Sequence, residues 1–264
     1  LFERIGRGVA LTGAGELLVR HALRVLGEVN DAEANLLAMA GAETGRISVG
    51  LVSTAKYFMP RLLARFAQEH PGIDVQFSVG NREALLQRLH DNAIDLAVTG
   101  RTPDEYDAHA EPVASHPYVL IGPADHPLRD ARRFDLHELR HDTFLLREEG
   151  SGSRRVAEEM FRNHLFTPAR TIGMGSNETI KQAVMAGMGV SLISLHTLPL
   201  ELKTGEVSLL DVIGTPIERT WYVVHMNAKR LLPAGRKFRG FLLDEAALVL
   251  EREFGRYLTG RTAA

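Results

Sequence analysis

Strand-like and helix-like segments alternate regularly along most of this chain, and that alternation restricts it to the α/β class of folds. Arg46–Val52 has the composition of a buried strand, and Val75–Val79 is strand-like again. Between them, Pro60–Gln68 has the apolar spacing of a helix, with Pro60 in the first turn, where its missing N–H costs nothing. Because parallel neighbours in a sheet need a crossover connection, this order predicts a parallel sheet with right-handed crossovers.

The alternation continues to the end of the chain in two blocks. The remaining expected elements are helices at Glu83–Leu89, Arg155–Leu165, Thr179–Ala186 and Pro233 to about Phe254, and strands at Ile94–Thr99, Tyr118–Gly122, Phe144–Leu146, Thr171–Gly173, Val190–Ser194 and Trp221–His225. We therefore expect two Rossmann-like lobes joined by two crossover strands, with lobe I at residues 46–117 and 220–254 and lobe II at 118–219. In such open sheets a ligand binds at the carboxyl ends of the strands, between hinged lobes.

A long helical pattern precedes the lobes. Thr12 has the character of an N-cap, and apolar residues recur at helical spacings as far as Ala42 without a proline. A helix of this length needs a partner helix. Before it, glycines on both sides of Arg7 predict a short hairpin. The expected organisation is thus residues 1–11, 12–42 and 43–264, with a hinge at Gly41–Gly45.

The composition excludes several classes of protein. The chain has 264 residues, is 45% hydrophobic and carries a net charge of −2, which supports packed cores and argues against a general polyanion binder. It has 0 cysteines, so it has no disulfide, thiolate metal site or cysteine nucleophile, and we expect it to work in the reducing cytoplasm. No apolar run approaches the length of a membrane span, and we expect no membrane partner. Because Leu1 is not Met, we also expect the chain to start inside a longer gene product.

The sharpest candidate site is the sequence Gly150-Ser151-Gly152-Ser153-Arg154, directly before an expected helix. Small residues let backbone N–H groups converge, the helix start adds partial positive charge, and serine hydroxyls donate hydrogen bonds. Arg154 adds a fork that suits a phosphate or carboxylate. The alternative is a plain helix cap with a solvated arginine.

Further candidates lie at the ends of other strands, where ligands of open sheets bind. Lobe I offers hydroxyls, an amide and cations, and lobe II offers a cation and an amide: Ser53, Thr54, Lys56, Asn81, Arg82, Thr99, Gly100 and Arg101 from lobe I, and Arg147 and Asn177 from lobe II. Several cations around one cleft favour a multiply anionic ligand. Two alternatives stay open: half of these cations pair with Glu83, Glu148 and Glu149, and Asn177 acts only as a helix cap.

Two motifs resemble other chemistry. His137-Glu138-Leu139-Arg140-His141 matches H-E-x-x-H, the signature of zinc proteases, but it lies in a short polar segment without a convincing third ligand. We interpret it as a chance match, with Leu136 and Leu139 as core contacts. Gly187 and Gly189 are better explained by tight packing than by a dinucleotide-binding loop. We assign no catalytic residue, metal or cofactor, and expect no enzyme.

Specific residues resemble a known family. Leu1–Leu18 is similar to the DNA-binding wing and linker-helix start of LysR-type transcriptional regulators, while Arg147–Arg154 and Ala186–Val190 match the second lobe of that family. A narrower set resembles the CbbR type, which regulates carbon-fixation (RuBisCO) operons. That set consists of Ser53–Pro60, Phe66, His70-Pro71-Gly72, Gly80–Glu83 and Asp95-Leu96-Ala97.

The resemblance implies a function that the residues alone do not give. It implies lobes of the periplasmic-binding-protein type II kind and a homodimer through the linker helix, with a homotetramer through the lobes. It further implies promoter DNA as a partner, bound through an N-terminal domain largely missing here, with Arg4 and Arg7 of the wing at the DNA. The implied effectors are ribulose 1,5-bisphosphate, phosphoenolpyruvate or NADPH.

Two rival classes share the two-lobe fold. A solute-binding protein of a transporter would have no use for a wing followed by a long dimerising helix. An enzyme would need acid and base groups in the cleft, where the candidates are mostly cations and hydroxyls.

Overall fold

The computed structural model describes residues 1–6, 8–39 and 44–258. These residues form two compact units, each built from separate stretches of the chain. Unit 1 contains Leu1–Ser53, Pro60–Glu111 and Tyr222–Leu243, and unit 2 contains Thr54–Met59, Pro112–Trp221 and Asp244–Ala264. The main passages, after Glu111 and after Trp221, lie close to the expected lobe boundaries at residues 117 and 220. Residues 54–59 and 244–254, which were expected in lobe I, belong to unit 2.

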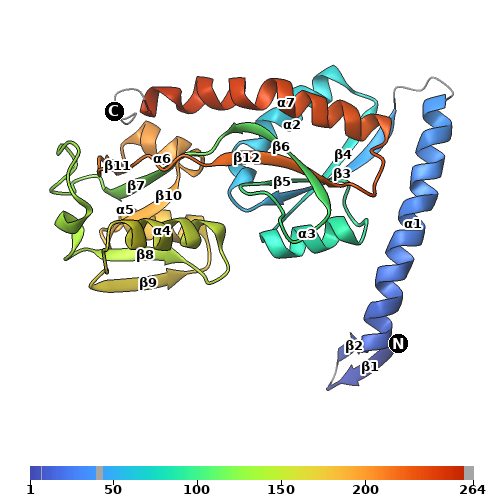
Figure 1. The fold of residues 1–264 in the computed structure, drawn as a ribbon, viewed down its shortest axis with the longest axis horizontal. Coiled ribbons are helices and arrows are strands. Elements are labelled where there is room, and N and C mark those ends of the chain that lie inside the picture. The colour runs from blue at the N-terminus through green and yellow to red at the C-terminus, as the bar shows by residue number, and fades with distance from the viewer. Residues whose placement is uncertain (7, 40–43, 259–264) are drawn as a thin grey trace. The chain divides into compact units, whose positions relative to one another are not determined.

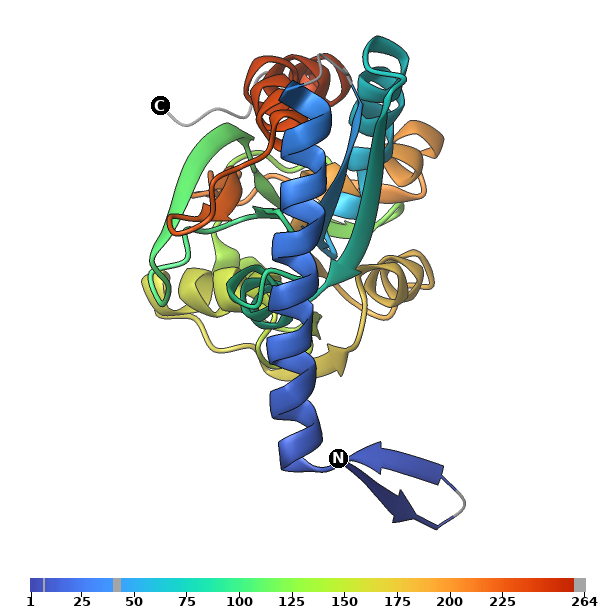
Figure 2. The same cartoon turned by 90° about the vertical axis from the view of Figure 1, so that its right-hand side faces the viewer.

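The N-terminal part of unit 1 is a hairpin followed by one long helix (Figures 1 and 2). Strands β1 (Phe2–Ile5) and β2 (Gly8–Leu11) pair antiparallel, and helix α1 spans Gly13–Met39. The Oγ1 atom of Thr12 accepts a hydrogen bond from Gly15 N at 3.2 Å, so Thr12 caps the helix as its sequence predicts. Arg7, the end of the expected helix and most of the expected hinge at Gly41–Gly45 lie outside the described residues.

The globular part of unit 1 is a five-stranded sheet in the order β4-β3-β5-β12-β6. Its elements are β3 (Gly45–Val52), α2 (Met59–Glu69), β4 (Ile73–Gly80), α3 (Arg82–His90), β5 (Leu96–Thr99), β6 (Ala108–Ser115), β12 (Thr220–Met226) and α7 (Pro233–Phe254). Four of them, α2, β6, β12 and α7, include residues of unit 2. Strands β3, β4 and β5 are parallel, and β12 runs antiparallel to β5.

Helices cover both faces of this sheet because its strands are apolar on both sides. Val49 and Leu51 of β3 are fully buried. Helix α2 and the first part of α7 lie above the sheet in Figure 1, where the Phe66 ring contacts Phe238 and Phe241 at centroid distances of 4.9 and 5.3 Å. Helix α3 lies on the other face and contributes leucines to the core.

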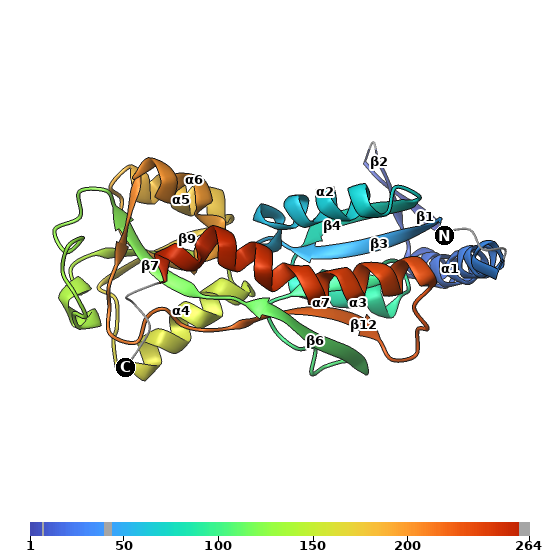
Figure 3. The same ribbon diagram turned by 90° about the horizontal axis from the view of Figure 1, so that it is seen from above.

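Unit 2 repeats the same plan with different strands (Figure 3). Its main elements are β7 (Tyr118–Pro123), β8 (Thr143–Arg147), α4 (Gly152–Asn163), β9 (Arg170–Met174), α5 (Asn177–Met185), β10 (Ser191–Ser194), α6 (Pro199–Thr204) and β11 (Val207–Leu210), with 3₁₀ turns η1 (Ala55–Tyr57), η2 (Leu136–Leu139), η3 (Leu195–Thr197) and η4 (Gly255–Tyr257). Strands β8 and β9 are parallel, and β10, β7 and β11 pair antiparallel. A parallel bridge between Phe144 and Val190 connects the two groups.

The expected α/β class, the two-lobe plan and the parallel pairing of the strands within residues 46–99 are confirmed, but each unit also contains antiparallel strands. In each unit one strand arrives from a crossover and inserts antiparallel: β12 beside β5, and β7 beside β10. Two further strands, β6 and β11, have no counterpart in the sequence-based expectations.

The core of unit 2 contains a polar aromatic cluster around the fully buried Trp221. The Trp221 ring stacks on His116 at a centroid distance of 3.8 Å and lies 5.1 Å from Phe58. Its Nε1 atom donates a hydrogen bond to His196 Nδ1 at 2.9 Å, and Phe254 of α7 packs on His196. Segments far apart in the sequence therefore meet in one core.

Gly189 has the packing role expected for it, whereas the expectation of tight packing is wrong for Gly187, where a Cβ would meet no atom within 4 Å. Gly187 adopts φ +75° in the turn after α5, and Gly189 adopts φ +153°. A Cβ atom on Gly189 would overlap the carbonyl oxygen of Thr143, which accepts a hydrogen bond from Val190 N at 2.9 Å.

Among the described helices, none is both long and apolar enough to span a bilayer.

Candidate anion-binding site

Two helices of unit 2 begin at the same edge of a sheet. Strands β8 and β9 are parallel, and their last residues, Arg147 and Met174, are directly paired. Helix α4 begins five residues after β8, at Gly152, and α5 begins at Asn177. The first N–H groups of a helix have no partner within the helix and carry partial positive charge, so this edge collects hydrogen-bond donors.

The start of α4 lacks the side-chain cap that the neighbouring helix has. Ser151 occupies the N-cap position with extended backbone angles, but its side chain makes no capping hydrogen bond. By contrast, Ser176 Oγ accepts a hydrogen bond from Thr179 N at 3.1 Å at the start of α5. Gly150, with φ +82°, lets the chain turn into α4. The backbone donors of α4 are therefore available to a ligand.

Arg147 joins the two helix starts. Its side chain is buried, donates to Asn177 Oδ1 at 2.8 Å, and donates to both carboxylate oxygens of Glu148 at 2.6 Å. Burial raises the pKa of Glu148, but the hydrogen bonds from Arg147 outweigh it and hold that pKa below its usual value. Ser176 is the cap of α5, so the alternative role of Asn177 as an N-cap is wrong. The buried Nδ2 atom of Asn177 has no hydrogen-bond partner among the described residues.

The other residues of the Gly150–Arg154 sequence face two environments. Ser153 is buried, and its Oγ lies 3.4 Å from the Tyr118 hydroxyl. Arg154 is partly exposed, donates to Glu158 Oε1 at 2.8 Å, and lies 3.7 Å from Glu149. The hydrogen bond to the Glu158 carboxylate raises the pKa of Arg154, which stays fully charged. An anion that used this guanidinium would have to displace a carboxylate one turn along the same helix.

The turn η1 brings three further groups to α5, within unit 2. Thr54 is buried at its start, and Lys56 Nζ lies 5.1 Å from the centroid of the Tyr57 ring. On the other side of that ring, Lys181 Nζ of α5 is 4.8 Å from the centroid. Burial and the neighbouring carboxylate of Glu178 raise the pKa of Tyr57 above its usual value.

Lys181 and Tyr57 were not among the residues expected from the sequence. Lys181 is buried, and its Nζ lies 3.0 Å from Glu178, 2.8 Å from Glu201 and 3.1 Å from Thr197 O. The sequence did offer a signal for Lys181. This lysine lies about one helix turn after Asn177, in a helix with an apolar face. Its two carboxylate partners make it a structural cation rather than an available one.

The strand-end candidates of unit 1 share one edge, as their positions predict. Ser53, Asn81 and Thr99 follow or end the parallel strands β3, β4 and β5. Their side chains make local contacts where the structure describes them. Asn81 Oδ1 accepts from Ala84 N at 2.8 Å and caps α3, and Thr99 Oγ1 donates to the carbonyl of Arg101 at 2.8 Å.

The cations of this edge are paired with acids. Arg82 donates to both carboxylate oxygens of Glu105 at 2.8 Å and to Thr102 O at 2.7 Å. These hydrogen bonds lower the pKa of Glu105 to about 2. Arg101, next to Gly100, lies 3.4 Å from Asp104 and 3.7 Å from Glu105. The alternative in which the candidate cations pair with acids is therefore supported. The acids involved are Glu105, Asp104 and Glu158, in addition to the expected Glu148 and Glu149.

The H-E-x-x-H sequence starts on the short turn η2, which ends before His141, so no α-helix aligns its two histidines. The Asp135 carboxylate caps this turn and contacts His137 Nδ1 at 2.7 Å. Leu136 and Leu139 are fully buried, which confirms them as core contacts.

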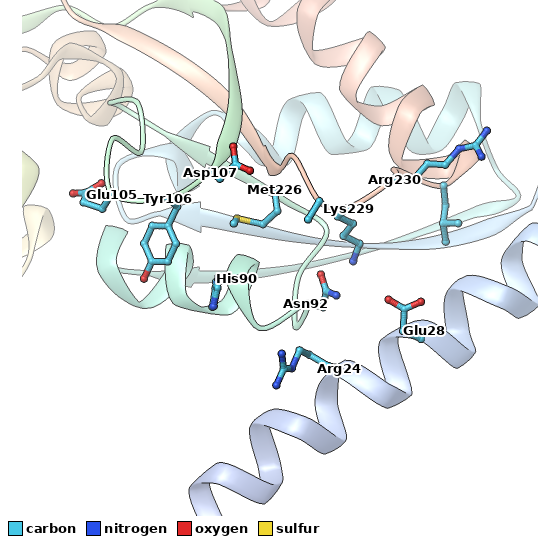
Figure 4. Close-up of a pocket in the computed structure, with 12 residues that line it drawn as sticks. Arg24, Glu28, His90, Asn92, Glu105, Tyr106, Asp107, Met226, Lys229 and Arg230 are labelled. Atoms are coloured by element: carbon cyan, nitrogen blue, oxygen red, sulfur yellow. The ribbon is translucent and has the colours of Figure 1, made fainter.

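One pocket in unit 1 is distinct from all of these candidates (Figure 4). It is lined by Arg24, Glu28, His90, Asn92, Glu105, Tyr106, Asp107, Met226, Ala228, Lys229, Arg230 and Leu232. None of the expected ligand residues line it, and it mixes cations with carboxylates.

Comparison with known proteins identifies the family. Residues 40–247 match the model of the LysR substrate binding domain. The chain is 60% identical over 264 residues to the HTH-type transcriptional regulator CfxR of Cupriavidus necator, covering 100% of this chain and 83% of that protein. It is 46% identical over 242 residues to the HTH-type transcriptional regulator CbbR of Rhodospirillum rubrum, covering 92% of this chain and 80% of that one.

Solved structures agree with this assignment. The CcmR regulatory domain of Synechocystis, determined in complex with 2-PG, is 38% identical with a TM-score of 0.72, covering 76% of this chain and 96% of that one. A mutant of OxyR from Corynebacterium glutamicum, 22% identical with a TM-score of 0.74, shares the fold over 100% of this chain and 81% of that one. The chain belongs to the LysR family of transcriptional regulators, carries that family's substrate-binding domain, and resembles the CbbR type.

Proposed function

We propose that this chain senses a small anionic metabolite and controls transcription of carbon-fixation genes in response to it. In unit 2 the anion binds at the start of α4, where the backbone N–H groups of Gly152, Ser153 and Arg154 and the Ser151 hydroxyl donate hydrogen bonds. The observation that carries this proposal is the missing side-chain cap of α4, beside a neighbouring helix that has one.

The surrounding groups have defined tasks in this proposal. Arg147 and the unpartnered amide nitrogen of Asn177 hold the site next to α4 and supply further donors. Lys56 contributes charge from η1, and Arg154 joins the anion only after leaving Glu158. The residues proposed to bind the ligand from unit 1 are Ser53, Asn81, Arg82, Thr99, Gly100 and Arg101, and unit 2 adds Thr54 at the start of η1.

The relatives support the chemical class of the effector. Several are named RuBisCO operon regulators, and the CcmR domain was determined with 2-PG. A phosphorylated intermediate of carbon fixation suits a site of backbone and hydroxyl donors at a helix start. Ribulose 1,5-bisphosphate, phosphoenolpyruvate and NADPH are the proposed effectors, and 2-PG is a useful additional probe.

The proposed response acts through the N-terminal elements. Helix α1 exposes many large apolar side chains, which favours pairing with α1 of a second copy. We infer a homodimer through α1, a homotetramer through the globular parts, and promoter DNA contacts near the hairpin, including Arg4 and Arg7. An effector shifts such an assembly only by binding one of its arrangements better than another. The family assignment favours this role over that of a transporter's solute-binding protein or an enzyme.

Calorimetric titration of the four compounds into the wild-type chain tests the site. Ser151→Ala should weaken binding at least tenfold, since a hydrogen bond to a charged group contributes about 1.5–3 kcal/mol. It should barely change the free energy of unfolding, because Ser151 makes no capping bond. Arg154→Ala should also weaken binding.

Ser176→Ala is the matched control for this experiment. It removes a real cap, so it should lower the free energy of unfolding by about 1 kcal/mol and leave the affinity nearly unchanged. Equal affinities of the wild type and Ser151→Ala would remove α4 from the binding site.

A further inference from the structure

Three potential metal ligands meet on one face of the unit 1 sheet, away from the proposed anion site. His109 and Glu111 lie two residues apart on β6, so their side chains point to the same face. His225 lies on β12, the neighbour of β6 in the sheet. One ligand atom from each residue lies within 4.8 Å of the others. We propose that His109, Glu111 and His225 bind a divalent transition-metal ion such as Zn²⁺.

The hydrogen bonding of His225 prepares it as a ligand. Its Nδ1 atom lies 3.1 Å from the carbonyl oxygen of Met226. A carbonyl only accepts hydrogen bonds, so Nδ1 carries the proton and Nε2 keeps its lone pair for a metal. Histidine ligands typically make this kind of second hydrogen bond, which fixes the tautomer and the ring orientation. Burial also lowers the pKa of His225, which favours the neutral, metal-binding form.

His109 completes the imidazole pair. Its ring centroid lies 5.3 Å from that of His225, and its Nε2 atom lies 3.6 Å from Glu111 Oε2, too far for a hydrogen bond. The 3.6 Å between His109 Nε2 and Glu111 Oε2 exceeds the distance of about 3.3 Å expected between two ligand atoms of a tetrahedral Zn²⁺ ion, so small side-chain rotations must bring the three groups together. The side chain of His109 is exposed to solvent.

Arg239 of α7 determines the strength of the site. It donates two hydrogen bonds to the Glu111 carboxylate and lowers the pKa of that group, so Glu111 is ionised. A carboxylate has about four lone-pair sites, so two remain for a metal. Arg239 then orients the ligand as an outer partner, while its positive charge opposes the ion. The proposal therefore predicts a modest affinity that rises when this charge is removed.

The position of the site gives it a regulatory meaning. Glu111 is the last residue of unit 1 before the long stretch Pro112–Trp221 of unit 2, and His225 lies three residues after the chain returns to unit 1 at Tyr222. A bound ion ties the two connecting strands to each other beside both passages. The ligand set of two imidazoles and one carboxylate suits Zn²⁺ or Co²⁺ and leaves a coordination position open, whereas Mg²⁺ prefers oxygen ligands.

Metal titration of the full, tag-free chain tests the proposal. Zn²⁺ binding is measured by calorimetry, and Co²⁺ binding by the visible absorption bands that report its coordination. The wild type should bind one ion per chain and should not respond to Mg²⁺. His225→Ala and His109→Ala should each weaken binding at least tenfold, and Arg239→Gln should tighten it.

His137→Ala is the matched control, since it changes the zinc-protease-like sequence and should leave the affinity unchanged. Trp221 emission, which reports the unit 2 core, checks that each variant is folded. The Co²⁺ spectrum of Glu111→Gln gives a second measurement, with a substitution that changes the side chain less than the two alanine substitutions do. The proposal is overturned by a wild type that binds no Zn²⁺, by equal affinities of the wild type and the two histidine variants, or by loss of binding in His137→Ala. None of these outcomes depends on the anion site at α4.

Discussion

The two buried histidines beside Trp221 are held neutral by their surroundings. His196 Nδ1 accepts the hydrogen bond from Trp221 Nε1, so it cannot carry a proton in this arrangement. Burial lowers the pKa of His196 to about 3, and burial lowers the pKa of His116 well below its usual value. In the unfolded chain both groups titrate near about 6.5. The unfolded state therefore binds more protons than the folded state below that pH.

Folding stability should fall as the pH is lowered from 7 to 5.5. Each histidine that stays neutral in the folded state but titrates in the unfolded state contributes a loss of about 1 kcal/mol over this range. Urea unfolding followed by Trp221 fluorescence measures the loss. Most carboxylates stay ionised across this window, and His116→Gln should reduce the loss of stability by about 1 kcal/mol. An unchanged pH dependence in that variant would contradict the role of His116.

For the residues of the proposed site, the sequence indicated some side-chain partners and not others. Two ion pairs are local and could be predicted from the sequence. Arg147 pairs with the adjacent Glu148, and Arg154 pairs with Glu158 one helix turn later. The bond between Arg82 and Glu105 joins residues 23 positions apart and follows only from the fold. Likewise, Ser176 rather than Asn177 caps α5, because one residue decides where a helix starts and sequence patterns do not resolve single residues.

At the scale of elements, the close approach of the Gly189 backbone to β8 gives a sharp prediction. Gly189→Ala should lower the free energy of unfolding by several kcal/mol, because the new Cβ overlaps the Thr143 carbonyl and φ is positive. Gly187 also has a positive φ, but a Cβ there meets no atom within 4 Å. Gly187→Ala should therefore cost only about 1 kcal/mol. Chemical denaturation compares the two, and equal losses would show that overlap is not the cause.

The elements that the sequence missed have physical reasons. Strand β6 contains Pro112 and several polar residues, because it is an edge strand that leaves unit 1 and needs no alternating apolar face. Strand β11 has four residues, too few for a periodic pattern. The antiparallel orientation of β7 and β12 could not be predicted from the sequence either. The direction of a strand in its sheet depends on the path of the chain between the lobes and not on the strand's own residues.

The exposed apolar side chains of α1 form a heptad pattern. Leu18 and Val25 lie seven residues apart, as do Val29 and Leu36, and all four are exposed. Val25→Glu should therefore weaken self-association at least tenfold, because it places like charges opposite each other in the paired helix. Sedimentation velocity measures the effect, and Arg20→Glu, on the opposite helix face, is the control. An unchanged association constant for Val25→Glu would exclude α1 as the dimer contact.

At the scale of the whole molecule, neither unit is a continuous stretch of sequence. Unit 2 takes its core from Thr54–Met59, from Pro112–Trp221 and from the residues after Asp244. Phe58 and Phe254, from the first and last of these segments, both pack on His196. The folding of unit 2 therefore depends on segments that lie between and after the stretches of unit 1, so the two units cannot be separated by cutting at one place.

Ending the chain at Leu243 tests this interdependence, because the cut removes residues that follow the last stretch of unit 1 and yet belong to unit 2. Leu250 and Phe254 are buried, and each contributes about 1.5–3 kcal/mol of burial free energy. That sum is a large part of the roughly 5–15 kcal/mol that stabilises a typical domain. Trp221 emission should shift to the red and the thermal transition of unit 2 should fall or vanish, whereas a chain ending at Leu258 should behave like the full chain. A blue-shifted Trp221 in the chain ending at Leu243 would mean that Pro112–Trp221 forms its core without the terminal helix.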